Sequence, residues 1–202
     1  MNAKLPKAKN ERGSIKLNNL HFPVSFGSIL ISWNSYGFLS RIEWSEAKLA
    51  HFQKVEIPSP FVELMDQIRA YFYAGEPLAQ IPWDRLDQAG WSCFQKEVYH
   101  KIASIPHGET RTYGWVAGQL GNSMASRAVG QALRKNPLPI LIPCHRVKSS
   151  TSLGGFMGTS DPSQPEIQLK RCLMMLEEEY QSPIFSFLPS GTSSLGRMRL
   201  RI

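Results

Sequence analysis

Hydrophobic positions in the first half of the chain predict a small sheet followed by a helix. Residues 24–33 and 38–44 are rich in β-forming residues and are separated by Asn34-Ser35-Tyr36-Gly37, which predicts a β-hairpin. Pro60 can start a helix, and apolar residues then recur at helical spacing up to Ala74-Gly75. We therefore expect an amphipathic helix packed on the sheet, buried through Phe61, Leu64, Met65, Ile68, Tyr71 and Phe72.

The second half of the chain has the periodicity of several helices. Ser92 and Gln95 have the spacing of a capping box at the start of the first one. Two short helices follow, with Thr112 and Ser123 as expected caps and a glycine turn between them. A further helix opens at Pro165. This order predicts a mostly α lobe that contains a helix-turn-helix.

A chain of 202 residues is long enough for two small lobes. The connection 77–90 contains two prolines and little periodicity, so we place the boundary there. The expected parts are a disordered basic arm (1–20), an α/β lobe (21–86), a mostly α lobe (91–180) and a basic tail (181–202).

Charge separates these parts further. The net charge is +7, and residues 94–148 carry eight basic residues against two acidic ones. Both ends of the chain are basic as well. Such segments are typical of proteins that bind polyanions, because each Lys or Arg near a phosphate displaces a counterion. For the two ends, a solvated arm and tail explain the charge equally well.

Several classes of protein are excluded or disfavoured. No apolar run approaches the roughly 20 residues of a membrane span, and residues 1–16 lack the apolar core of a secretory signal. We expect a cytoplasmic protein, or a nuclear one in a eukaryote, with no membrane partner. Cys93, Cys144 and Cys172 cannot all pair and show no C-x-x-C spacing, which disfavours a disulfide framework and a zinc site. No metal and no cofactor are expected.

Candidate chemistry centres on Ile142-Pro143-Cys144-His145-Arg146-Val147. A cysteine reacts as its thiolate, and an imidazole can accept the thiol proton directly or through a water. A carboxylate behind the imidazole would fix its tautomer, and Glu177 is a candidate for that role. The alternative is that Cys144 is a small buried hydrophobe and His145 satisfies a local hydrogen bond.

Further motifs occur around this cysteine in one order, and together they closely resemble the O(6)-alkylguanine-DNA alkyltransferase family, also called methylated-DNA–protein-cysteine methyltransferases. The resemblance covers Phe94 to about Gly158, with weaker support on both sides. It is carried by Gly108-Glu109-Thr110-Arg111-Thr112-Tyr113, Ser126-Arg127-Ala128-Val129-Gly130-Gln131-Ala132, Asn136-Pro137, the cysteine motif and Leu153-Gly154-Gly155-Phe156.

The resemblance implies both a fold and an activity. The N-terminal lobe would be α/β with a ribonuclease-H-like sheet, and the mostly α C-terminal lobe would bear the DNA site. Cys144 would take a methyl or other alkyl group from O(6) of guanine, and from O(4) of thymine, in duplex DNA. The resulting thioether is stable, so each molecule would act once. We expect a monomer whose partner is double-stranded DNA containing alkylated guanine.

The resemblance also assigns roles to residues of the reacting centre. His145 would be the water-mediated base for Cys144, and Glu177 its orienting carboxylate. Asn136 would hold the turn before the cysteine loop. Tyr113 would donate a hydrogen bond or a proton to the departing guanine, although taken alone it could simply be an aromatic that anchors a helix. The implied pocket is lined by Leu133, Pro139, Val147, Phe156 and Met157.

For DNA, the resemblance makes Arg127 the side chain that enters the base stack in place of a flipped nucleotide. A phosphate contact or a solvent-facing charge is the alternative for Arg127. Small residues around it would let the helix approach the minor groove closely. The remaining implied DNA contacts are Tyr113, Ser126, Ala128, Gly130 and Arg134.

Three departures from the family pattern leave the range of alkyl groups open. The stretch 148–152 lacks the usual glycine, Met157 replaces a small residue, and 159–164 resembles an insertion. One rival function is a related lesion sensor that flips the base without transfer, but such proteins lack the cysteine. A helix-turn-helix regulator would need side chains that read base edges, which the small residues do not offer. A thiol protease would place its histidine far from the cysteine in sequence.

Overall fold

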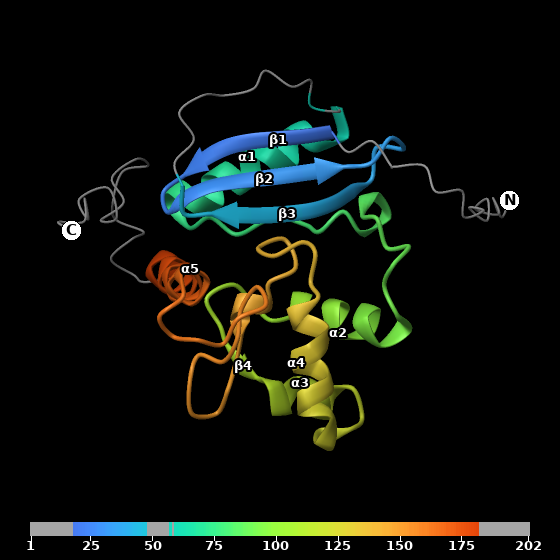
Figure 1. Ribbon diagram of the computed structural model, residues 1–202, viewed down its shortest axis with the longest axis vertical. Helices are drawn as coiled ribbons and strands as arrows, with labels where there is room; N and C mark the ends of the chain where they lie inside the picture. The colour runs from blue at the N-terminus through green and yellow to red at the C-terminus, as the bar shows by residue number, and fades with distance from the viewer. Residues whose placement is uncertain (1–17, 48–56, 58, 182–202) are drawn as a thin grey trace, which may run out of the picture.

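Three antiparallel strands form the main sheet of the N-terminal lobe (Figure 1). In the computed structural model, which describes residues 18–47, 57 and 59–181, they are β1 (Asn18–Val24), β2 (Gly27–Trp33) and β3 (Leu39–Ser45), paired in that order. The predicted hairpin is confirmed as β2 and β3. β1 begins inside the segment assigned to the basic arm, and as an edge strand it tolerates Pro23. The rest of that arm and residues 182–202 lie outside the described residues.

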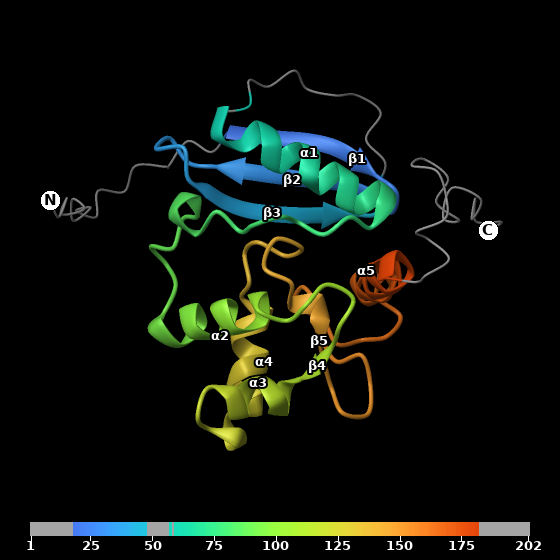
Figure 2. The same cartoon turned by 180° about the vertical axis from the view of Figure 1, so that it is seen from behind.

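The helix α1 (Ser59–Ala74) covers one face of this sheet (Figure 2). It ends just before Gly75, whose φ of +72° is the left-handed conformation that glycine adopts without steric cost. All six apolar residues predicted for its inner face are buried, so the predicted amphipathic helix is confirmed. The chain then passes to the second lobe through a single 3₁₀ turn, Trp83–Arg85.

The C-terminal lobe contains the predicted helices with one correction. α2 (Cys93–Ala103) has the expected capping box, and α3 (Tyr113–Gln119) is capped by Thr112 as expected. The prediction that Ser123 caps the next helix is wrong. Asn122 accepts from the backbone N–H of Met124 at 3.2 Å and opens a 3₁₀ turn instead. The helix α4 (Ser126–Arg134) begins only after that turn.

The remaining elements surround the cysteine motif. Short parallel strands β4 (Arg111–Thr112) and β5 (Val147–Lys148) pair beside the 3₁₀ turn Cys144–Arg146. The last described helix, α5 (Pro165–Gln181), lies beside the end of the sheet and confirms the helix predicted to open at Pro165 (Figure 1). The mixed α/β class is therefore confirmed, with a small sheet and several helices.

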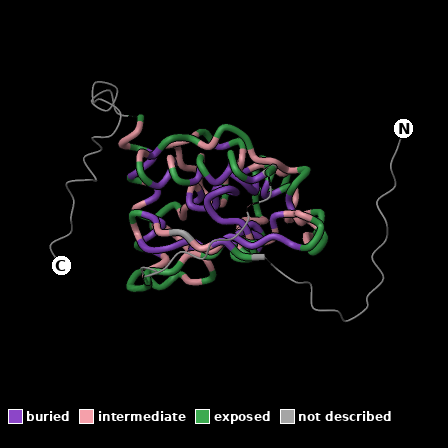
Figure 3. The backbone as a smooth tube through the Cα atoms, turned by 90° about the horizontal axis from the view of Figure 1, so that it is seen from above, coloured by how far each residue is buried: buried purple, intermediate pink, exposed green. Residues whose placement is uncertain are grey.

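The two lobes share one hydrophobic core. Seen from above, buried segments lie mostly toward the middle of the molecule and exposed ones toward its outside (Figure 3). Backbone hydrogen bonds also cross the boundary. Ile42 of β3 donates to the Pro137 carbonyl at 2.8 Å, and Asp87 of the connection between the lobes donates to the Leu39 carbonyl of β3 at 2.8 Å. The N-terminal sheet thus supports the loop that leads to Cys144. Among the described helices, none is long and apolar enough to cross a membrane.

Gly75, at the end of α1, packs closely against α5, so a substitution there tests how tight this contact is. A Cβ at this position would lie 2.8 Å from the Leu176 carbonyl oxygen, whereas a Cβ at Gly37, with φ +77°, would meet nothing within 4 Å. We expect Gly37→Ala to cost about 1 kcal/mol of unfolding free energy through backbone strain alone, and Gly75→Ala to cost at least about 2 kcal/mol. Urea unfolding measures both, and equal losses would show that the contact is not tight.

Candidate active site

The loop that carries Cys144 is held in an unusual conformation. Ile140 has φ +76°, which is uncommon for a β-branched residue. Asn136, placed by the sequence in this turn, fixes it from both sides: its Nδ2 donates to the Ile142 carbonyl at 2.9 Å, and its Oδ1 accepts from the Leu138 N–H at 3.0 Å. The same Nδ2 lies 3.2 Å from Cys144 Sγ. One amide therefore positions both the loop and the sulfur.

Cys144 is a buried thiol, 5% exposed. Burial raises its pKa, while the Asn136 amide, the charge of Lys170 and nearby backbone N–H groups act in the opposite direction without cancelling it. The group therefore rests as a neutral thiol at neutral pH. To react as a thiolate it must transfer its proton to a base.

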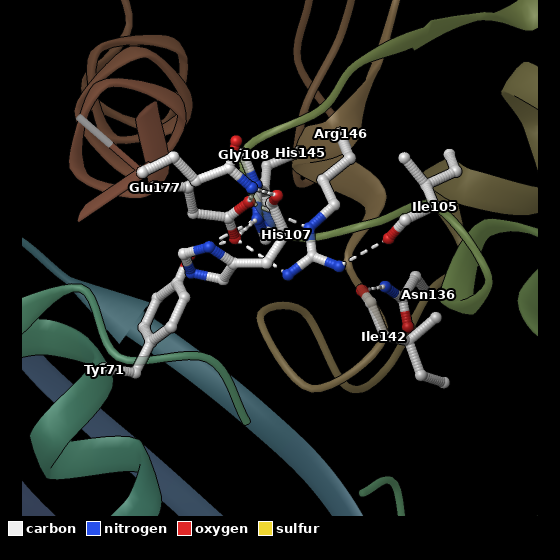
Figure 4. A network of polar contacts seen from close by, with 10 residues as sticks. Tyr71, Ile105, His107, Gly108, Asn136, Ile142, His145, Arg146 and Glu177 are labelled. Carbon is white, nitrogen blue, oxygen red and sulfur yellow. Dashed lines mark hydrogen bonds and ion pairs between the residues drawn. The ribbon is translucent and has the colours of Figure 1, made fainter. Parts of the chain in front are cut away.

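His145 can provide that base. Its ring is fully buried, and burial lowers its pKa, so the imidazole is neutral near pH 7. Nε2 lies 2.7 Å from Oε1 of Glu177, a carboxylate that can only accept, so Nε2 carries the proton (Figure 4). The other ring nitrogen, Nδ1, is buried and has no hydrogen-bond partner among the described residues. This tautomer leaves Nδ1 able to accept a proton.

Glu177 accepts hydrogen bonds from several parts of the chain. Arg146 donates Nε to Oε2 at 2.9 Å and Nη2 to Oε1 at 3.0 Å, and the Gly108 N–H donates to Oε2 at 2.9 Å. The Tyr71 hydroxyl donates to Oε1 at 2.8 Å. Burial alone would raise the pKa of Glu177, but His145 and Arg146 outweigh it and hold the pKa well below 4.5. The side chain is an anion throughout the working pH range.

A buried lysine lies on the same helix as Glu177. Lys170 is fully buried, and its ammonium donates to the carbonyls of Val147 and Leu153, each at 2.6 Å, and of Gly155 at 3.1 Å. Burial lowers its pKa to about 8, so it stays charged at pH 7. Lys170 therefore fastens the chain after the cysteine motif and places a positive charge near Cys144.

Tyr113 and Cys144 both line a cavity of about 570 Å³. Tyr113 is the first residue of α3, its hydroxyl donates to the Gly155 carbonyl at 3.3 Å, and burial raises its pKa. Gly154, with φ +68°, packs against the ring so closely that a Cβ would lie 2.8 Å from Cε2. The Tyr113 ring therefore packs against the segment 153–155, whose carbonyls also accept hydrogen bonds from Lys170.

The predicted pocket residues divide into two groups. Leu133, Phe156 and Met157 line the cavity together with Cys144. The prediction that Pro139 and Val147 line it is not met: Val147 is buried where β5 pairs with β4, and Pro139 is buried in the cysteine loop. Met157, one of the departures from the family pattern, has φ +46°, so its wall is also conformationally strained.

Most of the predicted DNA contacts also line the cavity. Ser126, Arg127, Gly130 and Arg134 lie along one side of α4 that faces it, and the Arg127 side chain is exposed. Ala128 is exposed on the same helix but does not line the cavity. In the described part of the chain, no group of three His, Cys, Asp or Glu side chains could hold a metal ion.

Sequence reasoning missed Tyr71 and Lys170 and gave Arg146 no role. Lys170 did leave a signal, because it falls on the apolar stripe of α5 with Ile167 and Leu173, where a charge is unexpected. Nothing in the sequence distinguished the Tyr71 hydroxyl from the other aromatics on its helix face.

The charge of Glu177 should be visible in the pH dependence of stability. We expect Glu177→Gln to cost about 3 kcal/mol at pH 7, because Arg146 loses its counter-charge. A carboxyl with a lowered pKa stabilises the fold above its unfolded value of 4.5 and loses that contribution as the pH falls. The difference between the two proteins should therefore shrink by about 2 kcal/mol between pH 5 and pH 3 in urea unfolding. The exposed neighbour Glu178→Gln is the control, and a difference that does not vary with pH would contradict the assignment.

Comparison with known proteins assigns the chain to a family. A family model for the DNA binding domain of 6-O-methylguanine DNA methyltransferase matches residues 93–179. The methylated-DNA–protein-cysteine methyltransferase of Methanosarcina acetivorans is 40% identical over 134 residues, covering 62% of this chain and 80% of the relative. That of Mycolicibacterium paratuberculosis is 44% identical over 117 residues, covering 57% and 68%. A crystal structure of Mycobacterium tuberculosis OGT in complex with DNA is similar with a TM-score of 0.60 at 30% identity, covering 79% of this chain and 92% of that one. The chain therefore belongs to the methylated-DNA–protein-cysteine methyltransferase family.

Proposed function

We propose that this protein repairs DNA by transferring a methyl or other alkyl group from O(6) of guanine, and from O(4) of thymine, in duplex DNA to Cys144. The observation that carries the proposal is the pairing of Cys144, a thiol that lines a cavity, with His145, the next residue in the sequence. His145 Nε2 is hydrogen-bonded to Glu177, and its Nδ1 has no hydrogen-bond partner among the described residues. Membership of the family supports the same reaction.

The reaction balances with the groups at this site. The thiol proton of Cys144 passes to His145 Nδ1, directly or through one water, and Glu177 stabilises the imidazolium that forms. The sulfur attacks the alkyl carbon, a C–S bond forms, and the C–O bond breaks with its electron pair on the base. Tyr113 donates its proton to the guanine, which therefore remains in the DNA as the neutral base, and the phenolate regains a proton from solvent as His145 releases the proton that it took from the thiol. Cys144 retains the alkyl group as a thioether.

The same chemistry makes the protein a single-use acceptor. A thioether is not cleaved by a neighbouring imidazole, carboxylate or phenol, so no second turnover follows. The proposed relay is contained in one chain, which supports action as a monomer. Repair would take place wherever the DNA is, in the cytoplasm or in a eukaryotic nucleus.

For DNA engagement, we infer that α3 and α4 act as a helix-turn-helix whose second helix enters the minor groove. The small residues Ala128 and Gly130 support a close approach of α4, and Arg127, which is exposed beside the cavity, would fill the gap left by a flipped nucleotide. In the N-terminal lobe, three antiparallel strands with α1 on one face are compatible with a ribonuclease-H-like sheet.

Peptide mapping tests the proposed acceptor. After incubation with a duplex that contains O(6)-methylguanine, mass spectrometry should find one methyl group per molecule, on Cys144. Cys93 and Cys172 serve as internal controls and should stay unmodified, and Cys144→Ser should abolish transfer. Tight lesion binding with unmodified Cys144 would instead identify a sensor that flips the base without transfer, and no lesion preference would refute both functions.

The proposed role of Arg127 makes a separate prediction. Because it assists extrusion of the base and not the transfer itself, Arg127→Ala should slow repair of duplex DNA by about tenfold or more while reaction with the free alkylated base changes little. Single-turnover rates with the two substrates measure this, with Arg85→Ala, an exposed arginine outside the cavity, as the control. Equal losses on both substrates would exclude the role.

A further inference from the structure

Tyr71 reaches the reacting centre from the other lobe. It lies on α1, outside the region 93–179 that the family model matches, and its side chain is completely buried. Its hydroxyl donates to Glu177 Oε1 at 2.8 Å and lies 3.3 Å from His145 Nε2 (Figure 4). A core tyrosine needs only one acceptor for its hydroxyl, but this one uses the carboxylate oxygen on which His145 depends.

The two carboxylate oxygens of Glu177 accept different numbers of hydrogen bonds. Oε1 accepts from Tyr71, His145 and Arg146, while Oε2 accepts from Arg146 and Gly108. An oxygen with two lone-pair directions cannot give three donors its full electron density. Each additional donor on Oε1 therefore weakens the bond that His145 makes to the same atom.

We propose that Tyr71 is a positioning residue of the transfer reaction, whose hydroxyl fixes the Glu177 carboxylate against His145 and moderates how strongly that carboxylate favours a protonated imidazole. The inference rests on the proposed function, since it assigns His145 the role of base. It makes the N-terminal lobe a working part of the site, because the moderating donor comes from α1.

Several other ionisable groups also act on His145. The ring is influenced by Glu177 and Lys170 from α5, by Arg146 in its own turn, and by His107 from the segment after α2. Arg146 and Gly108 still hold Glu177 when the Tyr71 hydroxyl is removed. Burial, together with Glu177, raises the pKa of Tyr71 well above 10, so its hydroxyl remains a donor at every working pH.

Tyr71→Phe removes the donor and keeps the ring. With one competitor gone, Glu177 should favour protonated His145 more strongly, and the acid limb of the single-turnover rate of methyl transfer should move up by about half a pH unit. The variant should then be about threefold slower than the wild type below the limb and similar to it on the alkaline side. A purely structural loss would lower the rate at every pH.

Ser25→Ala is the matched control. Its hydroxyl donates to the Phe72 carbonyl at 2.8 Å, so the substitution also removes a hydrogen bond that attaches α1, next to Tyr71, without touching Glu177. Its acid limb should coincide with that of the wild type. If the limb moves as far in this control as in Tyr71→Phe, the inference is overturned.

A fluorinated tyrosine at position 71 gives a test of opposite sign. Fluorination makes the phenol a stronger donor and preserves the fold, so the acid limb should move to lower pH. NMR titration of the His145 ring in DNA-free protein should show the same two directions. If the titration of His145 moves in neither variant, the inference about Tyr71 is overturned. If the wild type transfers no methyl group, the proposed function is refuted. The NMR titration needs no transfer, so the two failures can be told apart.

Discussion

The rest of the site depends on the hydrogen bonds that the buried carboxylate of Glu177 accepts. Glu177 stands on α5 and accepts hydrogen bonds from α1, from the segment after α2 and from the turn that follows Cys144. These segments are far apart in sequence and belong to both lobes. Because a buried anion is tolerated only when its donors are in place, folding of the site and assembly of the lobes are coupled.

The balance of charge explains how a buried thiol can still react. Arg146 compensates Glu177, and His145 is neutral, which leaves the ammonium of Lys170 without an anionic partner among these groups. A thiolate at Cys144 would be that partner, since the pKa effects of Cys144 and Lys170 on each other are reciprocal. Burial raises the pKa of the Cys144 thiol, and the positive charge of Lys170 acts in the opposite direction.

Much of the fold and part of the candidate site could be predicted from the sequence. The hairpin, α1 and the capping box of α2 follow from local periodicity and turn chemistry, which the tertiary structure did not override. The placement of Glu177 against His145 came from resemblance to a family, across an insertion that local patterns could not bridge. Ser123 failed as a cap because Asn122, one residue earlier, offered an equally suitable side chain.

What could not be predicted depends on contacts between distant parts of the chain. Tyr71 follows the same helical spacing as its apolar neighbours, and only the packing of α1 against α5 reveals its acceptor. Pro139 and Val147 are close in sequence to Cys144, yet both are buried and neither lines the cavity. Side-chain direction at such positions is set by a fold that sequence spacing alone does not determine.

The central claim is that His145 is a neutral base, with its proton on Nε2 and with Nδ1 available to the thiol of Cys144. Nitrogen NMR of the His145 ring at neutral pH tests it most directly, because protonated and unprotonated ring nitrogens have distinct chemical shifts. The account predicts a protonated Nε2 coupled to Glu177 and an unprotonated Nδ1. A proton on Nδ1, whether in the other tautomer or in an imidazolium, would contradict it.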